Sequence, residues 1–188
     1  EKQQGVFTPD DILKGCELQS PVVVYDFDYY YMGGLIAEYI SDLGHEVTII
    51  TPFENVSPWS FMSNEVNAIK AKMYEKNIKT ITEYRMSKLK NESLTLTHKI
   101  TKEIMDVDRR SLVIVGMRLP VDSLFKELSA NQSLLEDSGI KTLNNIGDSN
   151  SPGAVFHAVY AGHMYANTFD SGIDDDPYDF KFEYPVIQ

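Results

Sequence analysis

Short apolar runs of strand length alternate with apolar positions at helical spacing along the first third of the chain. Residues 21–27 and 46–51 are β-rich runs that predict two buried strands. The positions between them predict an amphipathic helix that Gly44 ends: Met32, Leu35, Ile36, Tyr39, Ile40 and Leu43. A second helix follows on one apolar stripe: Met62, Val66, Ile69 and Met73. Because strands joined by helices run parallel, this region predicts the start of an open, doubly wound α/β sheet.

The middle of the chain has a different pattern. Residues 79–83, 94–98 and 103–107 are short alternating stretches separated by polar turns, which is typical of an antiparallel meander. Residues 112–115 predict one more buried strand.

The last third predicts a short helix around residues 122–128, a strand over 141–146 and a third long helix. Ser151 is the expected N-cap of that helix, and Pro152 suits its first turn. Its predicted apolar face is Val155, Ala158, Val159, Gly162, Tyr165, Ala166 and Phe169.

The chain ends in an acidic stretch, Asp174 to Asp176, followed by an aromatic tail. We interpret the acidic stretch as a solvated linker. Phe180, Phe182 and Tyr184 alternate on one face of an extended segment, where exposure to water is costly. We therefore expect the tail to pack on another part of the protein or to join subunits into a homo-oligomer.

Composition excludes several classes of protein. The chain has 188 residues, of which 43% are hydrophobic and 24% charged, so it should fold. Its net charge of −11 disfavours nucleic acid and anionic membrane surfaces as partners. No apolar run approaches the length of a membrane span, so no membrane partner is expected.

Cysteine usage adds a constraint on chemistry and location. Cys16 is the only cysteine, so this chain forms no internal disulfide, cysteine-rich zinc site or cysteine-bound iron–sulfur cluster. A reducing, cytoplasmic location is expected. Because the chain starts at Glu1 without an initiator Met, we expect it to be a piece of a longer polypeptide.

The turn between the first predicted strand and helix is where a dinucleotide-binding domain carries Gly-x-Gly-x-x-Gly. Those glycines let the backbone approach a pyrophosphate. Here the turn carries Asp26, Asp28 and the run Tyr29 to Tyr31, so carboxylates repel phosphate and tyrosines fill the crevice. Thr51 stands where an acidic residue would hold a ribose. These residues favour a Rossmann-like scaffold that has lost its ligand over a standard NAD(P) site.

The same residues resemble a known family. Residues 22–34 and 44–48 closely resemble the trimethylamine and dimethylamine dehydrogenases and related NADH:flavin oxidoreductases. Residues 8–13 resemble the interdomain lead-in of that family. The remaining matching segments fall in the family's order and extend the resemblance to nearly the whole chain: residues 51–59, 115–120, 146–153 and 158–163.

The resemblance implies an architecture. Members resemble a flavin-bearing barrel with an iron–sulfur cluster, followed by two glutathione-reductase-like nucleotide domains, one inserted in the other. Residues 1–18 would be the lead-in of the host domain and 19–118 the inserted Rossmann-like domain with its meander. Residues 119–188 would be the returning part of an FAD-domain-like fold. FMN and a 4Fe-4S cluster are then implied for the whole enzyme, in an upstream barrel domain of the same polypeptide.

The resemblance also implies a candidate nucleotide site. Gly147 and Asp148 resemble a flavoprotein motif in which the aspartate accepts hydrogen bonds from a cofactor's sugar or ribitol hydroxyls. Gly153 and Ala154 begin the following helix, whose N-terminus suits a phosphate. ADP or FAD is the implied ligand. The alternative is that Gly147 only makes a tight turn, which Asp148 caps.

No catalytic residue and no metal ligand set is predicted in this chain. His157 and His163 lie six residues apart, which does not suit shared metal ligation, and His45 and His98 are isolated in the sequence. Arg118 resembles an element at the domain crossover, where a hinge or an interdomain ion pair is expected.

Three hypotheses follow for function. The first is a structural or ADP-binding C-terminal region of an amine-oxidising oxidoreductase whose chemistry is done by an absent barrel, so that the isolated chain is not catalytic. The second is a non-catalytic interaction domain built on a degenerate Rossmann fold. The third is an NAD(P)H-delivering domain, as in the dienoyl-CoA and enone reductases that the family resembles, against which the missing glycines count.

Overall fold

The computed structural model describes residues 4–169 and divides the chain into two compact units. The first unit is residues 1–117 and the second is residues 118–188. The predicted acidic stretch and aromatic tail lie outside the described residues. Among those residues, no helix is long and apolar enough to cross a membrane.

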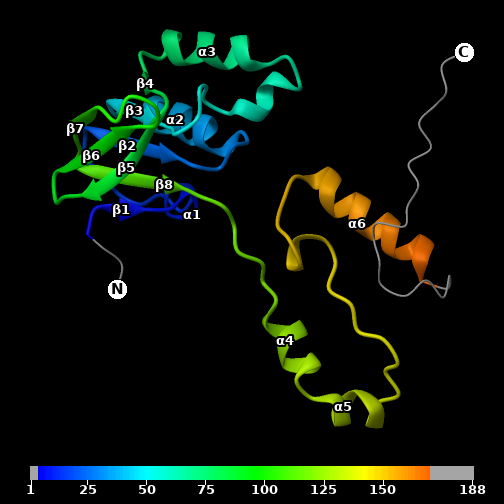
Figure 1. Ribbon diagram of the computed structural model, residues 1–188. Helices are drawn as coiled ribbons and strands as arrows, with labels where there is room; N and C mark the ends of the chain where they lie inside the picture. Colours follow the sequence, from blue (N-terminus) through cyan, green and yellow to red (C-terminus); the bar gives the residue numbers. More distant parts are fainter. Residues whose placement is uncertain (1–3, 170–188) are drawn as a thin grey trace, which may run out of the picture. The chain divides into compact units, whose positions relative to one another are not determined.

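A five-stranded parallel sheet forms the centre of the first unit (Figure 1). Its order is β1-β8-β2-β3-β4, with β2 in the middle. The strands are β1 (Val6–Phe7), β8 (Ser111–Val115), β2 (Val22–Asp26), β3 (Val47–Ile50) and β4 (Lys79–Ile81). All four pairings are parallel, so the predicted α/β fold with a parallel sheet is confirmed.

Helices cover one face of this sheet, and α2 and α3 lie together on that side in Figure 1. They are α1 (Pro9–Leu13), α2 (Met32–Asp42) and α3 (Val66–Glu75), with a 3₁₀ turn η1 (Pro58–Phe61) before α3. Ile36, Ala37 and Ile40 of α2 pack against Val22 and Val24 in one buried cluster. Since Val23 and Tyr25 point to the other face, β2 is buried on both sides, as its continuous apolar run predicts.

An antiparallel sheet covers the opposite face. It consists of β5 (Tyr84–Leu89), β6 (Ser93–His98) and β7 (Ile104–Asp108) in that order. Leu94 and Leu96 of β6 are fully buried against Val23 and Leu112 of the parallel sheet. The meander is therefore the second covering layer of the first unit.

The prediction for residues 79–83 was wrong in one respect. Residues 79–81 pair parallel with β3 as the sheet edge, and the meander starts at Tyr84. The register of β5 shifts between Met86 and Lys88, so alternation of inward and outward side chains breaks there. Because of this irregularity, residues 84–89 do not show the strict alternation of apolar and polar residues that predicts a strand.

The second unit is helical in its described part, residues 118–169. It contains α4 (Ser123–Ser129), α5 (Gln132–Asp137), a 3₁₀ turn η2 (Gly147–Ser149) and α6 (Val155–Thr168). The strand predicted over 141–146 is absent, and those residues have no regular secondary structure. A strand needs a hydrogen-bonded neighbour, and residues 118–169 contain no other strand to supply one.

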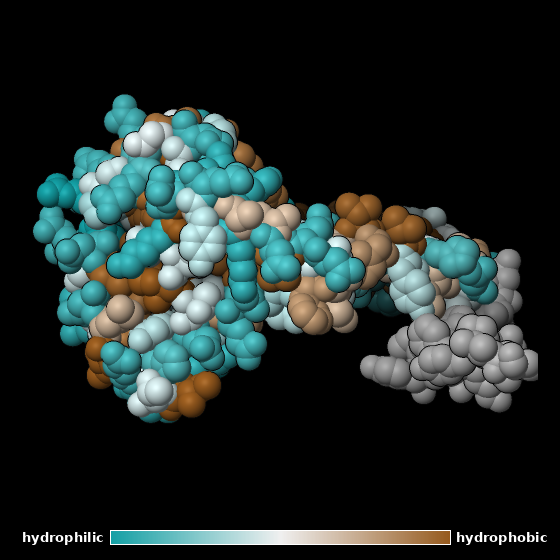
Figure 2. Space-filling model, turned by 90° about the horizontal axis from the view of Figure 1, so that it is seen from above, coloured by the Kyte–Doolittle hydropathy of each residue, from teal (hydrophilic) through white to brown (hydrophobic). Residues whose placement is uncertain are grey.

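Little apolar surface is buried in that part of the second unit. Leu135 is the one large apolar side chain between residues 118 and 169 that is buried. The predicted apolar face of α6 exists but is open, with Val155 at 81% and Val159 at 65% exposure. Figure 2 shows apolar side chains in brown among the polar surface. A large uncovered apolar surface in a folded protein marks a contact surface.

Candidate functional site

The turn that joins β2 to α2 is built around a buried acid. Asp26 ends β2 with no exposed surface, and its Oδ1 accepts the N–H of Asp28 at 3.0 Å. Its Oδ2 has no hydrogen-bond partner among the described residues. A Cβ added to Gly33 would stand 2.1 Å from Asp26 Cγ, so the carboxyl group occupies the space that a side chain at position 33 would need. The first turn of α2 therefore lies directly on the Asp26 carboxyl group.

Burial sets the ionisation of Asp26. Desolvation raises the pKa of its carboxyl group from 3.8 to about 6, the bond from the Asp28 N–H lowers the pKa, and the charge of Asp28 raises it. The turn thus disfavours even one negative charge. A pyrophosphate beside Asp26 would meet a stronger penalty, which agrees with the expectation that this turn is unsuited to phosphate.

Aromatic rings fill the carboxyl edge of the sheet above Asp26. We call Phe27, Tyr29, Tyr30, Phe53 and Trp59 the aromatic cluster. Successive rings lie 5.9 Å (Phe27 to Phe53), 5.2 Å (Phe53 to Tyr29), 6.1 Å (Tyr29 to Tyr30) and 5.5 Å (Tyr30 to Trp59) apart. Such contacts are favourable packing geometries. The crevice where open α/β sheets bind ligands is occupied here by the chain's own side chains.

The third tyrosine of the turn is held by a polar network. Tyr31 Oη donates to Glu65 Oε2 at 2.7 Å and lies 2.7 Å from Ser63 Oγ. Hydrogen bonds from Ser63 and from Tyr31 lower the pKa of the Glu65 carboxyl group. Asp26, Asp28 and Tyr31 have the spacing of the three glycines in a dinucleotide fingerprint. Each position at which a glycine would let the backbone approach a phosphate therefore carries a side chain here.

The implied nucleotide residues of the second unit lie together at the start of α6. Gly147 opens η2 with φ +63°, a conformation that favours glycine, and Asp148 Oδ1 accepts the N–H of Gly153 at 3.4 Å. The N–H of Ala154 donates to Nδ1 of His157 at 3.1 Å. The helix begins at Val155, three residues later than the Ser151 cap predicts, because His157 supplies the cap.

These contacts leave only part of a nucleotide site. Asp148 is exposed and its carboxylate faces the helix N-terminus, so it is available to a sugar hydroxyl. However, the strand expected before Gly147 is absent, and the N–H groups of the two residues just before the helix, Gly153 and Ala154, are already bonded to side chains. The remaining half of a binding site would have to come from outside residues 118–169.

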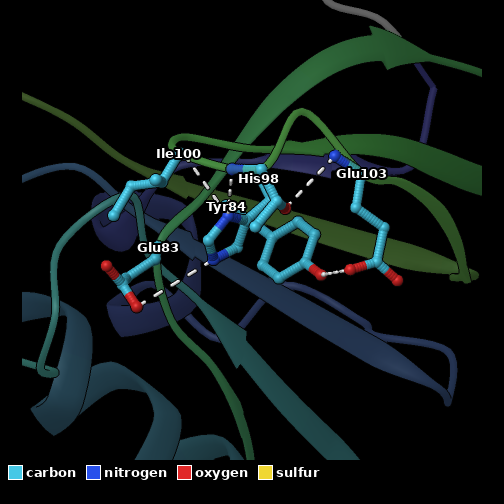
Figure 3. Close-up of polar contacts among 6 residues, drawn as sticks. Glu83, Tyr84, His98, Ile100 and Glu103 are labelled. Carbon is cyan, nitrogen blue, oxygen red and sulfur yellow. Dashed lines mark hydrogen bonds and ion pairs between the residues drawn. The ribbon is translucent and has the colours of Figure 1, made fainter.

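His98 is isolated in the sequence but not in space (Figure 3). Its Nδ1 accepts the N–H groups of Ile100 at 3.3 Å and Thr101 at 3.1 Å, so the ring carries its N–H proton on Nε2. Nε2 lies 3.9 Å from Glu83 Oε2, and the ring packs edge-on to Tyr84 at 4.9 Å. His98 thus joins the turn after β6 to the link between β4 and β5. It acts as a structural acceptor for the turn.

Arg109 is a buried residue that the sequence did not single out. Its guanidinium is 1% exposed and donates to the carbonyl of Gly5 at 3.2 Å and to that of Lys90 at 2.8 Å. Its Nε has no partner in the described part of the chain. The side chain joins the start of the chain to the turn between β5 and β6.

The first unit has a cavity at the amino edge of its sheet and a cleft beside its edge strand. A cavity of about 500 Å³ opens at the amino edge of the sheet, beside Gly5, Glu92 and Arg110. A smaller cleft of about 230 Å³ lies between α3, the edge strand β4 and the loop after β3. Within residues 4–169, no three His, Cys, Asp or Glu side chains are placed to hold a metal ion.

The chain is similar to a known domain family and to several known enzymes. Residues 7–110 match the family described as OYE-like second alpha/beta domain. Dimethylamine dehydrogenase of Hyphomicrobium sp. (strain x) is 24% identical over 191 residues, covering 92% of this chain and 25% of that protein.

Two solved structures are also similar. Histamine dehydrogenase from Rhizobium sp. 4-9 is 33% identical with a TM-score of 0.85, over 91% of this chain and 27% of that chain. The 6-hydroxypseudooxynicotine amine oxidase from Pseudomonas geniculata N1 is 28% identical with a TM-score of 0.75, over 85% of this chain and 24% of that one. The chain therefore spans about a quarter of the length of these relatives.

Proposed function

Because the chain belongs to the family of OYE-like second alpha/beta domains, we propose that it is the C-terminal nucleotide-domain region of an amine-oxidising flavoenzyme. In this proposal FMN and a 4Fe-4S cluster reside in an upstream barrel domain of the same polypeptide, which oxidises the amine. The present chain serves as a structural region with an ADP-type site. It works in the cytoplasm, in keeping with its single Cys16.

The observation that carries this proposal is the match to histamine dehydrogenase, at 33% identity and a TM-score of 0.85. The names of three relatives describe enzymes acting on amines: a dimethylamine dehydrogenase, a histamine dehydrogenase and an amine oxidase. The chain contributes no catalytic residue of its own to this chemistry.

The proposal divides the chain into two domains, and the burial of apolar side chains supports this division. Residues 19–118 would be the inserted glutathione-reductase-type domain, which the parallel sheet and the meander support. Residues 119–188 would return to an FAD-domain-like host, which would supply the missing strand neighbours of 141–146 and cover α6. The exposed apolar face of α6 supports this assignment, because burying it removes apolar area from water.

ADP or FAD is the proposed ligand of Gly147, Asp148, Gly153 and Ala154. The residues fit part of such a group: an exposed carboxylate can accept from a sugar hydroxyl, and the N-terminus of the 14-residue helix α6 favours a phosphate. The host domain would complete the site. We also propose, from the sequence, that the aromatic tail joins subunits into a homo-oligomer.

A second candidate function is a non-catalytic interaction domain. The buried Asp26 carboxyl group and the aromatic cluster favour it, because both occupy the place of a cofactor. The same observations count against an NAD(P)H-delivering domain, since hydride delivery requires the dinucleotide in that crevice.

Thermal unfolding with added nucleotides separates these candidates. A ligand present at 100 times its dissociation constant stabilises the folded state by about 2.7 kcal/mol. Stabilisation by ADP or FAD that disappears in Asp148→Ala supports the proposed site. Stabilisation by NADH or NADPH alone would contradict the proposal and favour the reductase. The complete reading frame tests whether a flavin-bearing barrel lies upstream in the same polypeptide. A reading frame without such a barrel would favour the interaction domain.

A further inference from the structure

The edge strand β4 leaves one side of its main chain open. It is the last strand of the parallel sheet, and β3 is its one neighbouring strand among residues 4–169. Ile81 directs its main chain towards β3, since its carbonyl oxygen accepts the N–H of Thr51 at 2.9 Å. Successive residues of a strand point their N–H and C=O groups to opposite sides. Those of Thr80 and Thr82 therefore face the open edge, where a further strand can bond to them.

The side chains along this edge alternate between the two faces of the sheet. Ile81 belongs to the buried cluster on the meander side, and Lys79, two residues earlier, points to the same side. Glu83 also contacts the meander. Thr80 and Thr82 lie on the opposite face, where they line the smaller cleft next to α3.

This order of side chains is complementary to itself about Ile81. A second copy of the strand can lie antiparallel to the first, with Ile81 opposite Ile81. Thr80 then stands opposite Thr82, and their main-chain groups bond to each other on both sides of a twofold axis. Lys79 stands opposite Glu83. Threonine pairs and pairs of opposite charge are both favourable across antiparallel strands.

The helix α3 presents an exposed ring beside the same edge. Lys72 and Lys76 pair with acidic side chains of α2, so their side of α3 faces α2. Lys70 and Tyr74 lie on the other side and line the cleft next to β4. Tyr74 is 82% exposed. A twofold axis normal to the sheet keeps both copies of α3 on one face, so each ring covers the new strand pair and loses apolar area to water.

We propose that the open edge of β4 is a self-pairing surface, through which two copies of this chain join their parallel sheets into one continuous sheet. The occupant is a second copy because the edge matches itself in hydroxyl groups and in charge. Interfaces that bury less than about 1,200 Å² are typical of weak or transient complexes, so we expect a reversible dimer. The proposal goes beyond the proposed function, in which subunits meet through the aromatic tail.

Sedimentation equilibrium and hydrogen exchange of the whole chain test the proposal together. We expect a dimer with a dissociation constant at or below about 1 mM. The amides of Thr80 and Thr82 should exchange more slowly as the protein concentration rises, because each becomes hydrogen-bonded. The amide of Ile81 is the control, since it already faces β3. A chain that stays monomeric at about 1 mM would overturn the proposal. So would an oligomer whose Thr80 and Thr82 amides stay unprotected, because another surface would then join its subunits.

Exchange of charge across the pair is the specific test. Lys79→Glu places acidic side chains opposite each other at both ends of the contact, so it should raise the dissociation constant roughly tenfold. Lys88→Glu on β5 makes the same change of net charge away from the edge and should leave the dimer intact. Combining Lys79→Glu with Glu83→Lys should restore most of the affinity. No effect of Lys79→Glu, or no recovery in the double variant, would contradict the pairing.

A second pair of variants tests the main chain. Thr80→Pro removes an N–H that faces the open edge and leaves the bonds to β3 in place, which edge strands tolerate. It should weaken the dimer by roughly tenfold or more, because one hydrogen bond is lost from each copy. Thr80→Val keeps the N–H and should dimerise like the parent. Equal dimerisation by Thr80→Pro and the parent would overturn the proposal.

Discussion

Asp26 is a fully buried carboxyl group whose Oδ2 has no hydrogen-bond partner among the described residues. Burial raises its pKa from 3.8 to about 6, so the folded chain holds this proton over a pH range in which the unfolded chain releases it. A group of this kind stabilises the folded state most below the unfolded pKa. That contribution is lost as the pH rises from about 4 to about 6.

Asp26→Asn should therefore become more stable relative to the parent as the pH rises. The gap in unfolding free energy should grow by up to about 3 kcal/mol between pH 4 and pH 7, which is the energy of a shift of about two pKa units. Urea unfolding at a series of pH values measures it. Asp10→Asn, at an exposed aspartate, is the control. A gap that is constant over this range would contradict the assignment.

The close approach of α2 to Asp26 makes a second prediction. Gly33→Ala should destabilise the chain by about 2 kcal/mol or more, because the new Cβ overlaps the carboxyl group. Gly34→Ala on the same helix is the matched control, since its Cβ would meet Ser57 Oγ at 3.2 Å and the hydroxyl can rotate. Adding Asp26→Ala should recover much of the loss in Gly33→Ala. Additive losses in the double variant would contradict the contact.

His98 predicts a local effect on the turn after β6. His98→Phe removes the acceptor for the N–H groups of Ile100 and Thr101, at a cost of about 1–3 kcal/mol. Hydrogen exchange at those two amides should accelerate, while amides inside β6 stay protected. His98→Asn keeps an acceptor near Nδ1 and should restore part of the protection. Equal acceleration throughout the meander would instead indicate a global loss of stability.

At the scale of elements, segments with a clear apolar period could be predicted from the sequence. Segments whose structure depends on a neighbouring strand could not. The strand at residues 22–26 and the buried face of α2 could both be predicted locally, because the spacing of their apolar residues is visible in the sequence. Whether residues 79–81 join the parallel sheet depends on the neighbouring β3, which no local pattern records. Residues 141–146 have a strand-like composition, but within 118–169 they lack a partner strand.

The candidate sites divide in the same way. Asp26, Asp28 and the tyrosines could be recognised as wrong for phosphate from residue type alone. The position of Gly33 against Asp26 could not, because it depends on how α2 packs on β2. The smaller cleft between α3 and β4 could not be predicted from the sequence either, since its lining residues come from a loop, a helix and an edge strand that are well separated along the chain.

At the scale of the whole molecule, the two units differ in how much apolar surface they bury. The first has two buried clusters on either face of its sheet, whereas the described part of the second buries Leu135 alone among its large apolar side chains. A segment that buries so little cannot offset the conformational entropy of ordering its backbone.

Expression of the two parts separately tests this difference. Residues 4–117 should unfold cooperatively on heating, and residues 118–169 should show no cooperative transition by circular dichroism. Adding the first part to the second is the control for assistance between them. A sharp thermal transition in residues 118–169 alone would contradict the prediction and give that segment a core of its own.

The pairing of β1 with β8 has one more consequence. Val6 at the start of β1 pairs with Leu112 near the amino end of β8. The last strand of the unit ends at Val115, three residues further along β8 towards the carboxyl edge of the sheet. At about 3.3 Å per residue, Val6 and Val115 are offset by roughly 10 Å along the strands. Removing residues 6–115 would therefore leave two ends about that distance apart, because the parallel sheet fixes the offset between Val6 and Val115.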